Sequence, residues 1–137
     1  MSVIVSQGYL SQMKNITLTE FNGSFVRFQS NIGNGVAMWC GDELPPAFCY
    51  NSELDIDELF QWGVNISRVN ANKDSIEIVG DKIIFTAKIL SHEKDGVLTI
   101  SLDEGVVFID VSQTPITDGY VSFFTTFNKV KLYPVAL

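Results

Sequence analysis

The sequence predicts a mainly β protein, an antiparallel β-sandwich or barrel of about eight to ten short strands with one short helix near residues 53–62. Three observations lead to this prediction. Many short segments alternate apolar and polar side chains, as half-buried strands do. Turn-forming residues separate these segments at intervals of about 8 to 12 residues. A single segment begins with the polar residues that are typical of a helix start.

The first clear element is a hairpin. Residues 16–21 and 24–30 both alternate in character, and they flank the pair Asn22-Gly23. This pair is the one best suited to a two-residue turn with positive φ at both positions. A second turn over residues 31–35 then leads into a strand over residues 36–40.

The second half of the chain continues the same pattern. Residues 82–90, KIIFTAKIL, place only apolar side chains on one side and a mixture on the other, as expected for a strand in a two-layer protein. Gly80-Asp81 joins this strand to the one before it. The other segments expected to be strands are 64–69, 75–79, 97–102, 106–111, 120–127 and 129–133.

The expected helix begins at a sequence that resembles a capping box. Ser52 is a suitable N-cap, Asp55 stands three residues later, and Gly63 is a suitable stop. Acidic residues in the first turn stabilise a helix, because their negative charge lies near the positive end of the helix dipole. The alternation of Leu54, Asp55, Ile56 and Asp57 also fits a strand, so the pattern here supports two interpretations.

The composition indicates one ordered domain over residues 1–137. The chain is 46% apolar and 18% charged, and its length suits a single hydrophobic core. The N-terminus has no export-signal pattern, and no apolar run is long enough to span a membrane. We therefore expect a cytoplasmic protein, in which Cys40 and Cys49 are reduced thiols rather than a disulfide.

The negative charge of the protein is concentrated in one part of the chain. The formal net charge is -7, and residues 28–67 contain no Lys or Arg. The acids of this window are Asp42, Glu43, Glu53, Asp55, Asp57 and Glu58. Nucleic acids and anionic membranes need a basic surface, so the charge argues against both and favours a basic partner. The alternative is that the acids only keep the protein soluble.

The sequence offers little for catalysis. His92, the single histidine, lies in a polar loop segment without the neighbours of a nucleophilic triad. Neighbouring acids such as Asp55 and Asp57 would need a cleft to act as an acid and a base. No ligand spacing typical of a metal site and no glycine-rich phosphate loop is present. We therefore expect a binding protein rather than an enzyme, with no metal and no cofactor.

Aromatic residues alternate with the acids of this window. Protein interfaces concentrate their energy in a few aromatic anchors inside a polar rim, and acids attract a basic partner. The alternative is that the tryptophans and Phe60 belong to the core. The expected partner-binding residues are Trp39, Asp42, Glu43, Tyr50, Glu53, Asp55, Asp57, Glu58, Phe60 and Trp62.

The chain is small, acidic and rich in expected strands, and its residues 42–62 read DELPPAFCYNSELDIDELFQW. In these features it resembles bacterial immunity proteins that neutralise polymorphic toxins in the cytoplasm. The resemblance implies a basic toxin domain, such as a nuclease, as the partner. Asp55, Asp57 and Glu58 would then take the place of phosphates in its cleft. The alternative function is a module that binds a small molecule or carbohydrate, with Trp39 and Trp62 lining a concave site.

Overall fold

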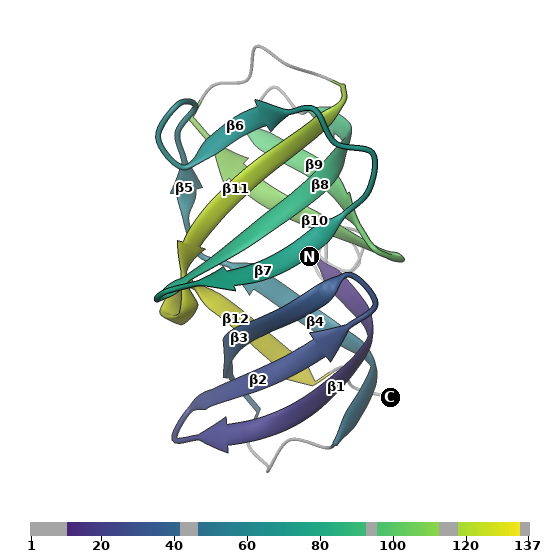
Figure 1. Cartoon of the computed structure of the whole chain (residues 1–137), viewed down its shortest axis with the longest axis vertical. Helices are drawn as coiled ribbons and strands as arrows, with labels where there is room; N and C mark the ends of the chain where they lie inside the picture. Colours follow the sequence, from purple (N-terminus) through teal and green to yellow (C-terminus); the bar gives the residue numbers. More distant parts are fainter. Residues whose placement is uncertain (1–10, 42–46, 93–95, 113–117, 135–137) are drawn as a thin grey trace, which may run out of the picture.

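The computed structural model describes residues 11–41, 47–92, 96–112 and 118–134, and most of these residues lie in strands (Figure 1). The mainly β prediction is confirmed. The described residues form twelve strands in place of the expected eight to ten, and two of these, Phe48–Ile56 and Leu59–Phe60, include residues expected to be helical. The strands are β1 Gln12–Asn22, β2 Phe25–Ser30, β3 Gly33–Trp39, β4 Phe48–Ile56, β5 Leu59–Phe60, β6 Ile66–Val69, β7 Ser75–Val79, β8 Lys82–His92, β9 Val97–Leu102, β10 Gly105–Val111, β11 Tyr120–Thr126 and β12 Val130–Pro134.

Five strands close into a barrel, which forms the lower half of Figure 1. Strands β1, β2 and β3 follow one another as hairpins, and β4 returns to pair with β1, which gives the strand order of a Greek key. Strand β12 completes the ring because it pairs antiparallel with β4 and parallel with β3. The last strand of the chain therefore closes a barrel that the first four begin.

Strand β1 bends so that it can serve two neighbours. Its first half pairs with β4 and its second half with β2, and the register shifts between Leu18 and Glu20. Such a bulge bends a strand and increases its twist. The predicted hairpin is confirmed, but its turn is one residue later than expected. Asn22 pairs with Phe25, so Gly23 and Ser24 form the turn, and Gly23 has the positive φ of 64°.

Seven strands, β5 to β11, lie in sequence between β4 and β12 and form the upper half of Figure 1. Strand β8 is central among them. Its first half lies between β7 and β11, and its second half pairs with β9. Strand β10 extends the sheet from β9 and pairs with β5, while β6 lies beside β11.

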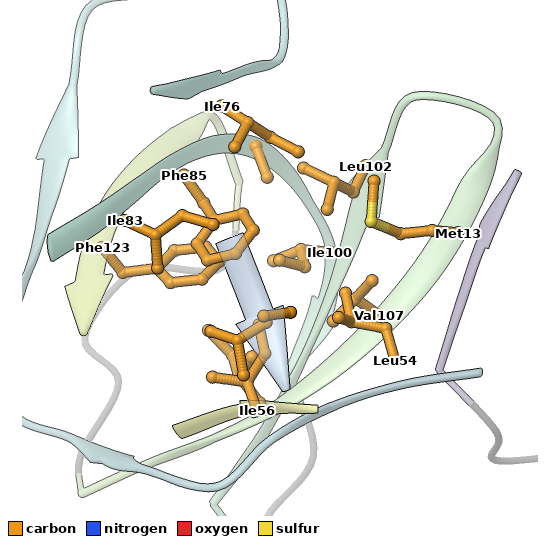
Figure 2. Packing of buried hydrophobic residues seen from close by; sticks show 14 of the residues in the cluster. Met13, Leu54, Ile56, Ile76, Ile83, Phe85, Ile100, Leu102, Val107 and Phe123 are labelled. Atoms are coloured by element: carbon orange, nitrogen blue, oxygen red, sulfur yellow. The ribbon is translucent and has the colours of Figure 1, made fainter. Parts of the chain in front are cut away.

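One hydrophobic core runs through the barrel and the upper strands. Side chains of both groups belong to a single buried cluster, which Figure 2 shows from close by. From the barrel come Met13, Leu54 and Ile56, and from the upper strands come Ile83, Phe85, Ile100, Leu102, Val107 and Phe123. Because apolar burial is continuous across the two groups, each stabilises the other.

Two glycines allow the barrel and the upper strands to come close together. Gly33 at the start of β3 lies against the carbonyl oxygen of Ile76 in β7, and Gly105 at the start of β10 lies against that of Gln12 in β1. A methyl group at either position would overlap this oxygen. Backbone contact of this kind requires a residue without a side chain.

The predicted helix over residues 53–62 is wrong. Strand β4 continues to Ile56 and β5 follows, and the one helical turn in the described part of the chain is a 3-10 turn at Phe127–Lys129. The physical reason is the pairing on both edges of β4. Strands β1 and β12 satisfy its backbone hydrogen bonds, and Leu54 and Ile56 point into the core. Tertiary pairing thus outweighs the local helix signals.

Candidate functional site

Three of the predicted acids gather around one lysine. Because Leu54 and Ile56 fill the core, the alternation of β4 directs Glu53 and Asp55 outward. Asp57 follows the strand, and its Oδ2 lies 3.7 Å from Nζ of Lys131. Lys131 in β12 is also the cross-strand partner of Asp55. We call Glu53, Asp55 and Asp57 the acidic face of β4.

Glu58 makes a different contact from these three acids. Oγ1 of Thr125, a buried residue of β11, donates a hydrogen bond of 2.9 Å to Oε1 of Glu58. Glu58 therefore binds the segment after β4 to the upper strands. Asp42 and Glu43 lie outside the described residues, as does the side chain of Tyr50.

Three aromatic residues of the predicted interface, Trp39, Phe60 and Trp62, belong to the core or pack against it. Phe60 has no exposed surface, and its ring meets that of Phe123 edge to face with centroids 5.1 Å apart. The prediction that Phe60 anchors a partner is therefore wrong, because its side chain fills the interior. Trp39 and Trp62 are partly buried against the same core.

Tyr133 lies at the edge of the acidic face, where it pairs with Glu53 across β12 and β4. Burial raises the pKa of its phenol above the ordinary value, and the charges of Cys40, Asp55 and Glu53 and a hydrogen bond with Cys40 raise the pKa further. A phenol in this setting keeps its proton. It adds a hydrogen-bonding group beside the carboxylates.

A second site lies where the barrel meets the upper strands, and sequence reasoning did not point to it. A hollow of about 520 Å³, which we call the junction cavity, opens beside the close approach of Gly33 to β7. Strands β3 and β7 lie next to each other at this junction (Figure 1). The lining residues are Asn31, Ile32, Gly33, Lys73, Asp74, Ser75, Lys88, Ser101, Asp103 and Tyr120.

Two carboxylates lie together in the junction cavity. The backbone N–H of Asp103 donates a hydrogen bond of 2.7 Å to Oδ2 of Asp74. Oδ2 of Asp103 is itself shielded from solvent and has no hydrogen-bond partner among the described residues. Burial raises the pKa of Asp74, and the charge of Asp103 raises the pKa further. The hydrogen bond and the charge of Lys88 act in the opposite direction.

Two lysines supply positive charge to the same cavity. Lys88 is exposed on β8, and its cross-strand partners are Tyr120 in β11 and Ser101 in β9. Lys73 precedes Asp74 in the segment before β7. In the described part of the chain, neither ammonium has a carboxylate within 4.0 Å. The cavity thus offers unpaired ammonium groups beside a pair of carboxylates.

Tyr120 separates the junction cavity from a second hollow. This neighbour has a volume of about 460 Å³ and is lined by Arg68, Val69, Asn70, Ala71, Gly119 and Tyr120. The guanidinium of Arg68 lies close to Gly119 at the start of β11. Three of the nine Lys and Arg residues of the chain therefore line the two hollows that share Tyr120.

The described residues contain no cluster of three or more His, Cys, Asp or Glu side chains that could hold a metal ion. In the same part of the chain, no helix is both long enough and apolar enough to cross a membrane. No family model, no curated protein and no solved structure matches the chain.

Proposed function

We propose that the protein binds a small polar ligand in the junction cavity. The observation that carries the proposal is the convergence of Asp74, Asp103, Lys88 and Tyr120 on one hollow. These side chains, two carboxylates, an ammonium and a phenol, come from separate parts of the chain. Ligand sites are concave, have volumes of about 300 to 1,000 Å³ and contain a few convergent polar groups. The raised pKa of Asp74 adds support, because perturbed carboxyls concentrate at functional sites.

The lining favours binding over a reaction. Among the described residues, it contains neither His nor Cys, the side chains that most often transfer protons or attack a substrate near neutral pH. Its polar groups instead resemble a recognition set, with hydroxyls on Ser75, Ser101 and Tyr120 and an amide on Asn31. The sequence also suggested a small-molecule site lined by Trp39 and Trp62. The junction cavity is not that site, because neither tryptophan lines it.

The test is a ligand screen by thermal unfolding, since a ligand that binds only the folded state raises its stability by mass action. The probes are free amino acids, mono- and disaccharides and nucleotides. A hit should be lost in Asp103→Asn and in Lys88→Met. It should persist in the control variants Asp81→Asn and Lys129→Met, whose positions do not line the cavity. A hit that is unaffected by both cavity variants would show that the ligand binds elsewhere.

We propose as a second candidate a cytoplasmic inhibitor of a basic bacterial toxin, which binds through the acidic face of β4. The supporting observation is that Glu53, Asp55 and Asp57 lie on one surface with Lys131. Among the described residues, Lys131 is the one cation within 4.0 Å of any of these acids. This surface is smaller than the sequence predicted, because Glu58 and Phe60 do not contribute to it.

The second candidate is tested by affinity capture from the native host. A basic protein should be retained by the wild type and released as salt is raised. The triple variant in which Glu53, Asp55 and Asp57 become Lys should lose it, because like charges at an interface repel. A matched control with the same net charge reverses Glu77, Asp81 and Asp110, which are exposed elsewhere. If the control variant loses the basic protein to the same extent, the loss reflects net charge alone, and the proposal that the acidic face binds the partner is rejected.

A further inference from the structure

The junction cavity has a negative side. The backbone N–H of Asp103 donates a hydrogen bond to the Asp74 carboxylate, which holds this carboxylate beside Asp103. Asp103 also has a left-handed backbone, with a φ of 56°, which belongs to the tight turn between β9 and β10. Asp103 lines the cavity, and its Oδ2 accepts no hydrogen bond from the described residues, so rotation of this carboxylate into the cavity would offer an unsatisfied acceptor to a donor group. An ammonium group supplies both the hydrogen bonds and the positive charge.

The cavity also has a positive side. Lys88 lies between Tyr120 and Ser101 in a row across β11, β8 and β9, and Lys73 lines the same hollow. Arg68 is on the other side of Tyr120. This register places Lys88 beside two residues that carry hydroxyl groups, Tyr120 and Ser101. A carboxylate or another small anion is the group that such a set binds.

The two sides together restrict the class of ligand. A simple anion would be repelled by Asp74 and Asp103, and a simple cation would be repelled by Lys73 and Lys88. A neutral ligand would remove water from these charges without pairing them, which is costly. A molecule with an ammonium group at one end and an anionic group at the other pairs with both sides at once.

We propose that the ligand of the junction cavity is a zwitterion of about amino-acid size, with its ammonium group at Asp74 and Asp103 and its anionic group at Lys88 beside Tyr120. This inference rests on the proposed function of the same cavity. It adds the charge pattern and the orientation of the ligand.

The test uses linear ω-amino acids, from glycine to 6-aminohexanoate, each compared with the amine and the carboxylic acid that correspond to its two ends. Binding is measured by isothermal titration at low salt. At the best chain length, the zwitterion should bind at least about tenfold more tightly than either single-charge analogue, since each end adds a charge-assisted hydrogen bond. Equal affinity of the zwitterion and one analogue would overturn the proposal.

Two variants test the orientation. Asp103→Asn should weaken binding of the zwitterion and the amine but not of the acid, which loses a repulsive charge. Asn also tolerates a left-handed backbone. Lys88→Met should weaken binding of the zwitterion and the acid but not of the amine, and it keeps the apolar part of the side chain. If Asp103→Asn does not fold, Asp74→Asn replaces it. The opposite pattern of losses would reverse the orientation and refute the assignment.

The same titrations separate the ligand class from the proposed function. One outcome is that a neutral saccharide binds, that Lys88→Met abolishes this binding, and that no zwitterion binds. This outcome would overturn the proposal of a zwitterionic ligand but would keep the cavity as a binding site. No binding of amino acids, saccharides or nucleotides would overturn both.

Discussion

The backbone N–H of Asp103 donates a hydrogen bond of 2.7 Å to Oδ2 of Asp74, and this contact joins the turn after β9 to the segment before β7. The two residues are 29 positions apart in the chain. Asp103 has a left-handed backbone in the tight turn between β9 and β10, and from this turn its amide reaches the carboxylate of Asp74. The contact therefore places two carboxylates in one hollow, at a cost that appears in the raised pKa of Asp74.

This cost predicts how the stability of the protein depends on pH. Since burial raises the pKa of Asp74 in the folded state, the ionised carboxyl destabilises the fold above that pKa. As the pH falls through the raised pKa, the folded protein takes up a proton before the unfolded chain does, and the penalty disappears. Asp74→Asn should therefore be more stable than the wild type at neutral pH, by less than about 1 kcal/mol because the group is partly solvated.

Urea unfolding of both proteins between neutral and acidic pH measures this difference. Asn retains an oxygen that accepts the hydrogen bond from Asp103, so the comparison isolates the charge. The advantage of Asp74→Asn should shrink as the pH falls. A growing advantage at acidic pH would contradict the prediction, and Asp81→Asn, an exposed acid in a turn, serves as the control.

The position of Phe60 gives a second prediction. Its ring is fully buried against Phe123, whereas its neighbour Leu59 is 53% exposed. Phe60→Ala should lower the free energy of unfolding by about 3–5 kcal/mol, the usual cost of removing a large core side chain. Leu59→Ala should change it by less than about 0.5 kcal/mol. Urea unfolding of the two variants measures both values. Similar small losses of stability at both positions would contradict the burial of Phe60.

The sequence was informative where structure is local. Residues 82–90 alternate over their whole length, and β8 contains all of them. At residues 53–56 the same kind of information was ambiguous, since the helix-start residues coincide with an alternation of Leu54 and Ile56 with acids. This segment is a strand because β1 and β12, which come from opposite ends of the chain, pair with the two edges of β4. A local pattern does not contain that information.

The junction cavity could not be predicted for a similar reason. Asp74 and Asp103 occur in short polar segments between strands, and turns commonly contain such residues. Lys88 and Tyr120 occupy ordinary strand positions. Only the pairing of β8 with β9 and β11, together with the hydrogen bond between the two acidic segments, brings them together.

The close approach of β10 to β1 gives a third prediction. A methyl group on Gly105 would overlap the carbonyl oxygen of Gln12, so Gly105→Ala should destabilise the protein by about 2–3 kcal/mol. Gly80 in the turn before β8 has open space around it but a positive φ of 65°. Gly80→Ala should therefore cost only about 1–2 kcal/mol from backbone strain. Thermal and urea unfolding compare the two variants. A larger loss at Gly80 would contradict the contact between β10 and β1.

Tyr133 gives a fourth prediction, at alkaline pH. Because burial and nearby negative charge raise the pKa of its phenol, the unfolded chain loses this proton first as the pH rises through the ordinary value. Stability should therefore fall above about pH 10 in the wild type, and less so in Tyr133→Phe. The tyrosinate absorbance lost in Tyr133→Phe reports the pKa of this residue directly. Cys40→Ala should lower that pKa more than Asp55→Asn does, since Cys40 contributes both a charge and a hydrogen bond. A larger effect of Asp55→Asn would show that the acidic face, and not Cys40, is the stronger influence on the phenol.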